Sequence, residues 1–222
     1  MLALPSRLLL ALIAIGCTVQ IWLNLNAGGT NAVFAKMSAS TGFVLLALAS
    51  GALHTRYGKA ILCGMCLSWF GDLLLAGGTE TLFLAGLVAF LCGHLAYVWA
   101  FVAHGVVWKS VGGSLAGVAV VSGTVATGLF GFIPPHMTIP VLVYIVVISV
   151  MVATSIGARF AGGVLLMPLG AVMFYVSDLA VAIEQFVKPD FPNYVWGLPL
   201  YFGGQALLAL SVAGAPRAQT VN

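Results

Sequence analysis

The chain alternates between long apolar stretches and short polar breaks. A membrane helix needs about 20 mostly apolar residues, and cutting the chain at its polar and Gly/Pro-rich breaks leaves eight stretches of about that length. They cover residues 5–25, 31–53, 59–77, 81–103, 108–129, 138–157, 162–184 and 194–214. The connections between them are all short. The pattern therefore predicts an all-α fold, a polytopic transmembrane bundle of eight helices in which residues 1–222 form a single integral membrane domain.

Composition adds that most of the molecular surface faces lipid. Hydrophobic residues make up 62% of the chain and charged residues only 6%, whereas soluble domains carry about 25% charged residues. The net charge of +3 is small and scattered, so we expect no nucleic-acid partner. Arg7 precedes the first apolar run as it would in a signal peptide, but no small-residue cleavage site follows. We interpret this run as a retained first span.

The distribution of basic residues predicts how the bundle is oriented. Lys and Arg in short loops mark the cytoplasmic side of a membrane protein. One side of the predicted bundle collects Arg7, Arg56, Lys59, Lys109, Arg159 and Arg217, and the other collects only Lys188, beside acidic residues. We expect both termini to be cytoplasmic, and the chain to be a multi-pass protein of the plasma (inner) membrane.

Two stretches of the chain resemble two later ones, which suggests an internal repeat. Trp69-Phe-Gly-Asp72 resembles Tyr175-Val-Ser-Asp178, and Phe90-Leu-Cys-Gly93-His94 resembles Tyr201-Phe-Gly-Gly204-Gln205. The two halves would be related as a 4+4 parallel repeat, with chance similarity among apolar residues as the alternative. Small residues allow close helix packing in lipid, and we assign that role to seven glycines. They are Gly112, Gly113, Gly117, Gly162, Gly163, Gly203 and Gly204.

Four ionisable residues lie inside the predicted spans, where each costs several kcal/mol and is a candidate functional residue. They are Lys36, Asp72, His94 and Asp178. Polar companions on the same or neighbouring spans are Ser68, Tyr97, Tyr144, Ser177, Tyr201 and Gln205. Glu80, Glu184 and Asp190 fall near the outer interface, where we expect water to solvate them.

The predicted topology places these residues at similar depths. At 1.5 Å per residue, Asp72 lies roughly 20 Å and Asp178 about 24 Å from the cytoplasmic side. Lys36 enters from the opposite side and lies about 8 Å down, while His94 and Gln205 reach the midplane from that side. The shared depth predicts one pocket that opens toward the outer leaflet. Ser68 and Asp72 share a helix face, as do Tyr201 and Gln205.

Structural roles remain open for each of these residues. Lys36 could extend to the interface, His94 could be a hydrogen-bonded packing residue, and the aspartates could pair with Lys36 only to orient helices. We expect no metal, because His54, His104 and His136 sit at loops on both faces and leave His94 alone in the membrane. Cys63-Gly-Met-Cys66 has a redox-motif spacing but is interpreted as two small residues in an apolar helix.

The ordered set of motifs resembles the YhhN-like membrane protein family, which includes the lysoplasmalogenases. The resemblance rests on Ser68-x-x-Gly71-Asp72-x-Leu-Leu, Phe90-x-x-Gly93-His94-x-x-Tyr97, Tyr144, Phe174-x-x-Ser177-Asp178 and Tyr201-x-x-x-Gln205. Many members carry Lys-Pro early in the second span, whereas this chain has Lys36-Met37. The resemblance implies hydrolysis of the vinyl ether bond of a lysoplasmalogen to a fatty aldehyde and a glycerophospho-headgroup. It implies a lysophospholipid substrate. We expect no cofactor, and we predict no protein partner.

The residues suit that chemistry. Vinyl ether cleavage begins with protonation of an alkene carbon, and a carboxyl group in an apolar pocket can hold the required proton. A second carboxylate, kept charged by Lys36 or His94, can stabilise the oxocarbenium ion and orient water, so Asp72 and Asp178 are the catalytic candidates. The sequence does not say which aspartate is the acid. Two alternatives are a small transporter or carrier with a polar site at the midplane and a hydrolase of esters or amides, although no Ser/His/Asp set supports the latter.

Overall fold

Eight long helices account for nearly all of the part of the chain that the computed structural model describes, residues 3–26 and 29–215. Each is long and apolar enough to cross a membrane, and no strand occurs in those ranges. They are α1 (Leu4–Asn26), α2 (Thr30–Ala49), α3 (Arg56–Leu75), α4 (Glu80–His104), α5 (Trp108–Leu129), α6 (Pro135–Phe160), α7 (Leu166–Ala182) and α8 (Asn193–Gly214). The prediction of an all-α bundle with eight membrane helices is confirmed.

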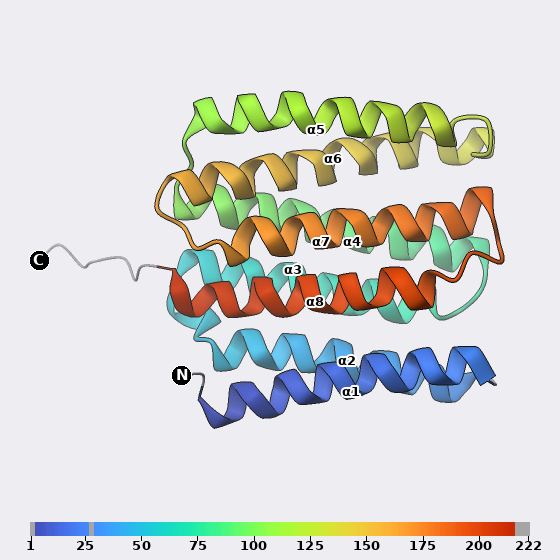
Figure 1. The fold of residues 1–222 in the computed structure, drawn as a ribbon, viewed down its shortest axis with the longest axis horizontal. Coiled ribbons are helices and arrows are strands. Elements are labelled where there is room, and N and C mark those ends of the chain that lie inside the picture. Colours follow the sequence, from blue (N-terminus) through green and yellow to red (C-terminus); the bar gives the residue numbers. More distant parts are fainter. Residues whose placement is uncertain (1–2, 27–28, 216–222) are drawn as a thin grey trace, which may run out of the picture.

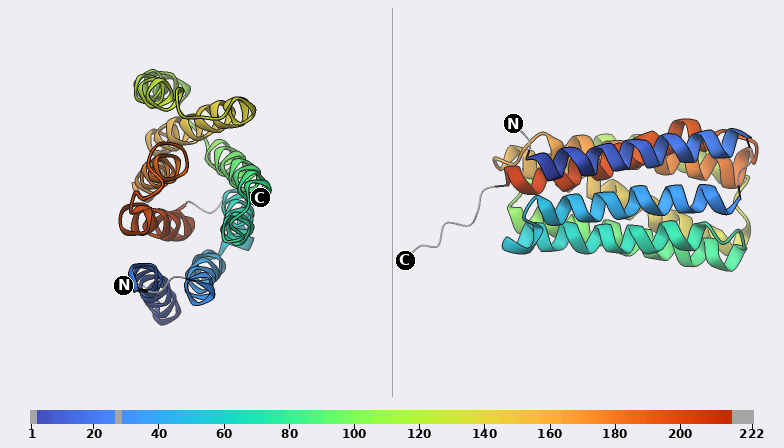
Figure 2. Two further views of the ribbon diagram at one scale, coloured as in Figure 1. Left: turned by 90° about the vertical axis from the view of Figure 1, so that its right-hand side faces the viewer. Right: turned by 90° about the horizontal axis from the view of Figure 1, so that it is seen from below.

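The helices run side by side, and alternate helices point in opposite directions (Figure 1). Consequently α1 begins and α8 ends at the same end of the bundle. We call the opposite end, where α1, α3 and α7 finish and α2, α4 and α8 begin, the distal end. The end-on view places α5 at one edge of the bundle and α1 and α2 at the other (Figure 2). Which end faces the cytoplasm stays a prediction from the Lys/Arg distribution.

Several predicted boundaries were wrong, and local backbone chemistry explains where the helices stop. The second span ends at Ala49 rather than residue 53, because Gly51 adopts φ 89° and a short 3-10 turn, Ala52–His54, follows. The sixth span continues to Phe160, where Gly162 at φ 94° marks its end. The seventh therefore begins at Leu166, not residue 162. Positive φ is accessible to glycine at little cost, which makes it a natural helix terminator.

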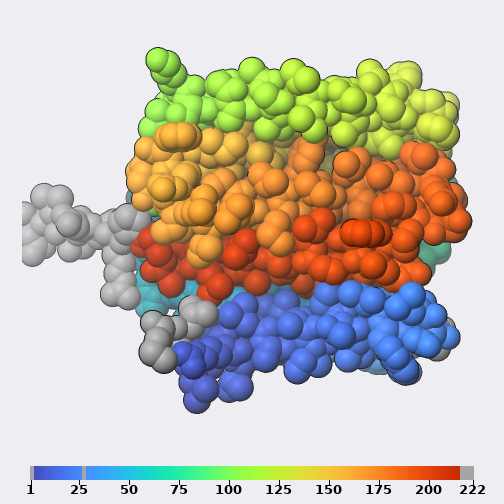
Figure 3. All heavy atoms as spheres, in the orientation of Figure 1, coloured from blue at the N-terminus to red at the C-terminus, as the bar shows by residue number. Residues whose placement is uncertain are grey.

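Apolar side chains cover the outside of the bundle. Val120 on α5 and Ile139 on α6 are 72% and 73% exposed. The face drawn in Figure 3 is built from α5, α6, α7, α8 and α1 in that order. Water would not tolerate so continuous an apolar surface, whereas lipid does. The molecule is a multi-pass membrane protein.

Glycines bring α3 against α4 and α7 against α8, but not all the predicted glycines do so. A Cβ at Gly64 would lie 2.4 Å from the Tyr97 ring, and one at Gly170 would lie 2.8 Å from the Gly204 carbonyl oxygen. Gly112, Gly113 and Gly117 on α5 have nothing within 4 Å of such a Cβ. Their predicted packing role is wrong for the described chain, because α5 lies at the bundle edge and turns these positions outward.

The two tight helix pairs use corresponding contacts. The Gly64 carbonyl oxygen lies 3.2 Å from the Cβ position of Gly93, and the Gly170 carbonyl oxygen lies 2.9 Å from that of Gly204. These glycines correspond when the first half of the chain is matched to the second. An internal repeat requires such paired contacts, and the repeat itself stays a prediction.

Gly170→Ala should destabilise the protein by about 1–3 kcal/mol, because the added methyl group meets backbone that cannot move aside. Gly117→Ala provides a matched control in an exposed helix, where nothing obstructs the methyl group. Thermal unfolding in detergent should show a lower midpoint for Gly170→Ala and an unchanged or higher midpoint for Gly117→Ala. Equal midpoints would contradict the packing described here.

Candidate active site

Asp72, on α3, is held as a carboxylate by three donors from two other helices. Its Oδ1 lies 3.0 Å from Lys36 Nζ on α2. Its Oδ2 accepts hydrogen bonds of 2.6 Å each from Ser40 Oγ, also on α2, and Tyr201 Oη on α8. The Asp72 side chain is only 2% exposed. Full ionic and hydrogen-bond pairing is what makes a buried carboxylate tolerable, so this group is anionic.

Asp178, on α7, has a different environment. Its Oδ2 accepts a 2.6 Å hydrogen bond from Tyr144 Oη on α6 and lies 3.1 Å from His94 Nε2 on α4. The same His94 nitrogen lies 2.8 Å from the Tyr144 hydroxyl. Oδ1 makes no hydrogen bond within the described chain, and the side chain is 18% exposed. One carboxyl oxygen of Asp178 is thus left available to a ligand.

The protonation state of His94 decides whether Asp178 has a cationic partner. The ring is fully buried, and its Nδ1 has no hydrogen-bond partner among the described residues. An imidazolium would carry an N–H at both ring nitrogens, and burying a charged donor without an acceptor is costly. The unpaired Nδ1 favours a neutral ring that donates through Nε2. In that form the contact with Asp178 is a hydrogen bond and not an ion pair.

The two carboxyl groups use the same pattern of contacts to join the first half of the chain, α1–α4, to the second half, α5–α8. Each receives hydrogen bonds from the preceding even-numbered helix of its own half, Ser40 on α2 for Asp72 and Tyr144 on α6 for Asp178. Each also contacts the last helix of the other half, Tyr201 on α8 or His94 on α4. The polar cluster consequently fixes how the halves dock.

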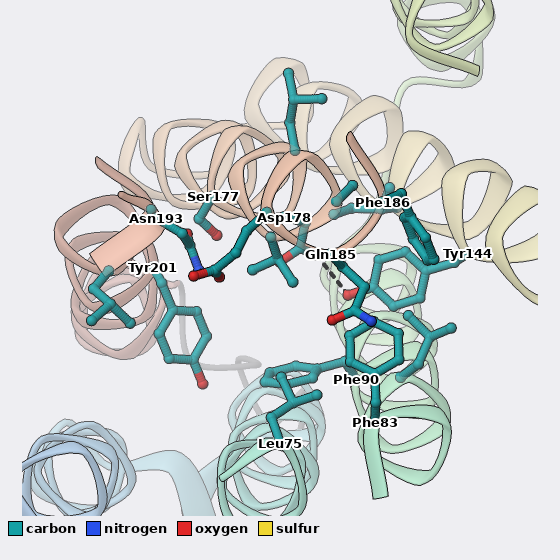
Figure 4. Close-up of a pocket in the computed structure, with 18 of the residues that line it drawn as sticks. Leu75, Phe83, Phe90, Tyr144, Ser177, Asp178, Gln185, Phe186, Asn193 and Tyr201 are labelled. Carbon is teal, nitrogen blue, oxygen red and sulfur yellow. Dashed lines mark hydrogen bonds between the residues drawn. The ribbon is translucent and has the colours of Figure 1, made fainter. Parts of the chain in front are cut away.

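Both carboxyl groups line a cavity of about 330 Å³ that reaches the distal end. Figure 4 shows Asp178, Tyr144 and Tyr201 around this space, with Gln185 and Asn193 nearby. Its lining is polar in one part and apolar in another. The polar part contains Gln20, Asn24, Lys36, Glu184, Gln185 and Asn193, and the apolar part contains Val125, Leu129, Val141, Ile145, Ile148 and Leu179. A cavity of this kind matches an amphipathic ligand.

The structure does not bring all ten predicted site residues to one pocket. Lys36, Asp72, Tyr144, Ser177, Asp178 and Tyr201 line the cavity. His94 lies behind them and reaches the site only through its hydrogen bonds.

Three further residues belong to the helix packing. Ser68 Oγ donates to the Gly64 carbonyl of its own helix, and Tyr97 donates to Gln205 Oε1 at 2.7 Å, away from the cavity. The estimated depths grouped these residues at one level of the bundle, but depth says nothing about which way a helix face points.

Sequence reasoning missed Ser40 and misjudged Glu184. Ser40 follows Lys36 by one helical turn, so the shared face could have identified it. Glu184 was expected to be solvated at the interface, but it lines the cavity and accepts a 2.9 Å hydrogen bond from Asn193 Nδ2. It lies in a π-helical turn, Ile183–Val187, that continues α7. Ordinary helical spacing does not predict that turn.

The fold and this site define a polytopic membrane protein with two carboxyl groups at an amphipathic cavity. The model of the YhhN family matches residues 31–212, and the chain belongs to that family. A lysoplasmalogenase of Mycobacterium bovis is 34% identical over 183 residues, which cover 79% of this chain and 67% of that protein. A protein of the same name from Mycobacterium tuberculosis matches to the same extent. Human lysoplasmalogenase TMEM86B is 25% identical over 183 residues, covering 81% of this chain and 73% of that protein. No solved structure matches the chain.

Lys36→Met should destabilise the protein by about 3–5 kcal/mol, because it leaves the Asp72 carboxylate buried without its cation. The double variant Lys36→Met/Asp72→Asn should recover most of that loss, since it removes both charges. Thermal unfolding of the wild type, both single variants and the double variant forms a cycle that measures the pair. Additive losses would show that the two groups do not interact in the folded protein.

Proposed function

We propose that the protein is a membrane-embedded lipid hydrolase that cleaves the vinyl ether bond of a lysoplasmalogen. The observation that carries this proposal is Asp178, a carboxyl group with one unpaired oxygen in a cavity that suits a one-chain lipid. The names of the relatives agree with it. The polar part of the cavity would receive the glycerophospho-headgroup, and the apolar part would receive the start of the alkenyl chain.

Asp178 is the proposed acid. Tyr144 and His94 are both neutral donors to Oδ2, so no cation stabilises a negative charge on this carboxyl group. A general acid must still hold its proton when the substrate binds, and a carboxyl group that has no cationic partner suits this role better than Asp72 does. Oδ1, which makes no hydrogen bond within the described chain, would carry the proton into the cavity.

Asp72 is the proposed permanent carboxylate. Lys36 pairs with Oδ1 and two hydroxyl groups donate to Oδ2, an arrangement that holds the charge throughout the reaction. A fixed negative charge beside the reacting atoms stabilises positive charge that develops in the transition state. Its oxygens can also orient the attacking water. Tyr201 donates to this carboxylate and lines the same cavity, so it holds the Asp72 carboxylate in place there.

The proposed steps balance without a cofactor. Asp178 transfers its proton to the alkene carbon remote from the ether oxygen, and the resulting oxocarbenium ion pairs with the new carboxylate. Water adds to the carbon bonded to oxygen, and its extra proton returns to Asp178. The hemiacetal then transfers its hydroxyl proton to the glycerol oxygen as the carbon–oxygen bond breaks. The products are a fatty aldehyde and the free glycerophospho-headgroup.

The bond to be cut lies near the boundary between headgroup and chain in a lysolipid. A cavity that reaches the distal end could bind such a lipid with its headgroup toward that end. Together with the Lys/Arg distribution, this argues for cytoplasmic termini, a site in the outer half of the plasma (inner) membrane, and one catalytic domain over the whole chain.

Asp178→Asn should lower aldehyde release from a lysoplasmalogen at least about 100-fold, the usual contribution of a general acid. Lysolipid binding should persist, because the amide keeps the shape and the acceptor oxygen. Asp72→Asn should lower kcat as well. The measurement is aldehyde production by purified full-length protein, with Asp190→Asn as a control because Asp190 is exposed outside the cavity.

Two outcomes would count against the proposal. Undiminished aldehyde release by Asp178→Asn would remove that residue from the chemistry. A wild-type protein that binds lysoplasmalogen and releases no aldehyde would instead favour the alternative, a carrier that uses the same polar site. Transport of labelled lysolipid across vesicle membranes would then distinguish the carrier from an inactive preparation.

A further inference from the structure

The mouth of the cavity contains a carboxylate that the proposed reaction does not use. Glu184 lies in the π-helical turn after α7 and lines the cavity. Its Oε2 accepts a hydrogen bond from Asn193 Nδ2 at the start of α8. Because Asn193 uses its amide nitrogen for this bond, it orients Glu184 without neutralising it. π-helical turns inside longer helices are frequent at functional sites.

Glu184 has no ion pair within the described residues. Lys36 is the other charged residue of the polar part, and its ammonium group is already paired with Asp72 at 3.0 Å. Glu184 is half-buried, so its carboxylate is partly removed from water, and Lys36, the cation whose charge reaches it, forms its ion pair with Asp72 instead. Such a charge is costly unless a positive group binds beside it.

A second group at the cavity also lacks a partner. The Gln20 side chain on α1 is 93% buried, from a relative exposure of 7%, and its Oε1 has no hydrogen-bond partner among the described residues. Gln20 lines the same cavity as Glu184, and Asn24 lies one turn further along the same face of α1. An unpaired buried acceptor is normally satisfied by a donor.

We propose that Glu184 and Gln20 bind the primary ammonium group of a phosphoethanolamine-type headgroup and thereby select substrates by headgroup. This inference rests on the proposed hydrolysis of lysolipids at the same cavity. A primary ammonium group offers one positive charge and three N–H donors, so it matches the chemistry of both unpaired groups that line this cavity. A quaternary ammonium group offers the charge without a donor, and an amine-free phosphate headgroup would be repelled by Glu184.

The spacing between Glu184 and Asp178 fits this assignment. The two residues are six positions apart on one continuous helical segment, which corresponds to about 9 Å along its axis. In a lysolipid, the glycerol and the phosphate separate the vinyl ether bond from the headgroup amine. With the vinyl ether at Asp178, the amine would therefore lie toward the distal end, where Glu184 is found.

The experiment compares three lysoplasmalogens that share one alkenyl chain and differ in headgroup: phosphoethanolamine, phosphocholine and phosphate alone. We expect wild-type kcat/KM to fall in that order. Glu184→Gln, which keeps the bond to Asn193, should lower kcat/KM for the phosphoethanolamine substrate about 10- to 100-fold, mainly through KM, as expected for a charged hydrogen bond. It should raise kcat/KM for the amine-free substrate, because the repulsion is lost.

Two variants separate charge from hydrogen bonding. Gln20→Met, which has similar volume but no acceptor, should narrow the preference for phosphoethanolamine over phosphocholine. Glu80→Gln is the matched control, because Glu80 is exposed at the distal end, contacts His136, and does not line this cavity. Thermal unfolding of each variant checks that it folds as the wild type does.

If the ratios of kcat/KM among the three headgroups are the same in the wild type and in Glu184→Gln, the inference is overturned and the proposed reaction still stands. If the wild type releases no aldehyde from any substrate, the proposed reaction fails, and binding then decides the inference. Saturated alkyl ether lysolipids with the three headgroups cannot react as vinyl ethers, so their affinities can be measured directly. Tighter binding of the phosphoethanolamine form, lost in Glu184→Gln, would support the inference, and equal affinities would end it.

Discussion

The cost of placing carboxyl groups among membrane helices determines the arrangement of the whole core. Asp72 is nearly inaccessible, and it is tolerated because an ammonium group and two hydroxyl groups converge on it. Those donors come from α2 and α8, so the bundle cannot separate without exposing the charge to lipid. The equivalent scheme at Asp178 joins α4 and α6 to α7. Polar pairing holds these helices together, because the hydrophobic effect does not drive helices to associate in lipid.

The two carboxyl groups satisfy that constraint differently, and their different chemistry follows. Asp72 has a cation on one oxygen and two hydroxyl donors on the other, whereas Asp178 has a tyrosine and a histidine on one oxygen and no partner on the other. The unpaired Nδ1 of His94 is the detail that separates them, because it favours a neutral ring over an imidazolium. In the proposed reaction, one fold thus supplies a fixed negative charge and a proton-carrying group on the wall of one cavity. The separation of two carboxyl environments is a recurrent basis for assigning acid and base roles.

Hydropathy was sufficient to predict the eight helices, because lipid requires apolar stretches of nearly fixed length. It failed at Gly51 and Gly162, whose positive φ ends helices inside apolar runs. The cost of burial identified Lys36, Asp72, His94 and Asp178, and all four meet in two clusters. Tyr97 and Gln205 were wrongly placed in the pocket, because the depth of a residue does not reveal which way its helix face points. Ser40 was missed because a serine is inexpensive in a helix. Glu184 was expected to be solvated because ordinary helical spacing does not show that a π-helical turn directs it toward the cavity.

The cavity has more side chains that carry or can acquire a negative charge than side chains that carry a positive one. Lys36 balances Asp72, while Glu184 has no ion pair within the described chain. In the proposed reaction, Asp178 becomes negative only after it gives up its proton. A substrate with a cationic headgroup would pair with Glu184. The positive charge that develops at its reacting carbon would then pair with Asp178. The first charge is present on binding and contributes to affinity. The second exists only in the transition state, so a carboxylate generated beside it contributes to rate, because catalysis depends on interactions that strengthen as the reaction proceeds. The same cavity can therefore separate recognition from catalysis along the length of one helix.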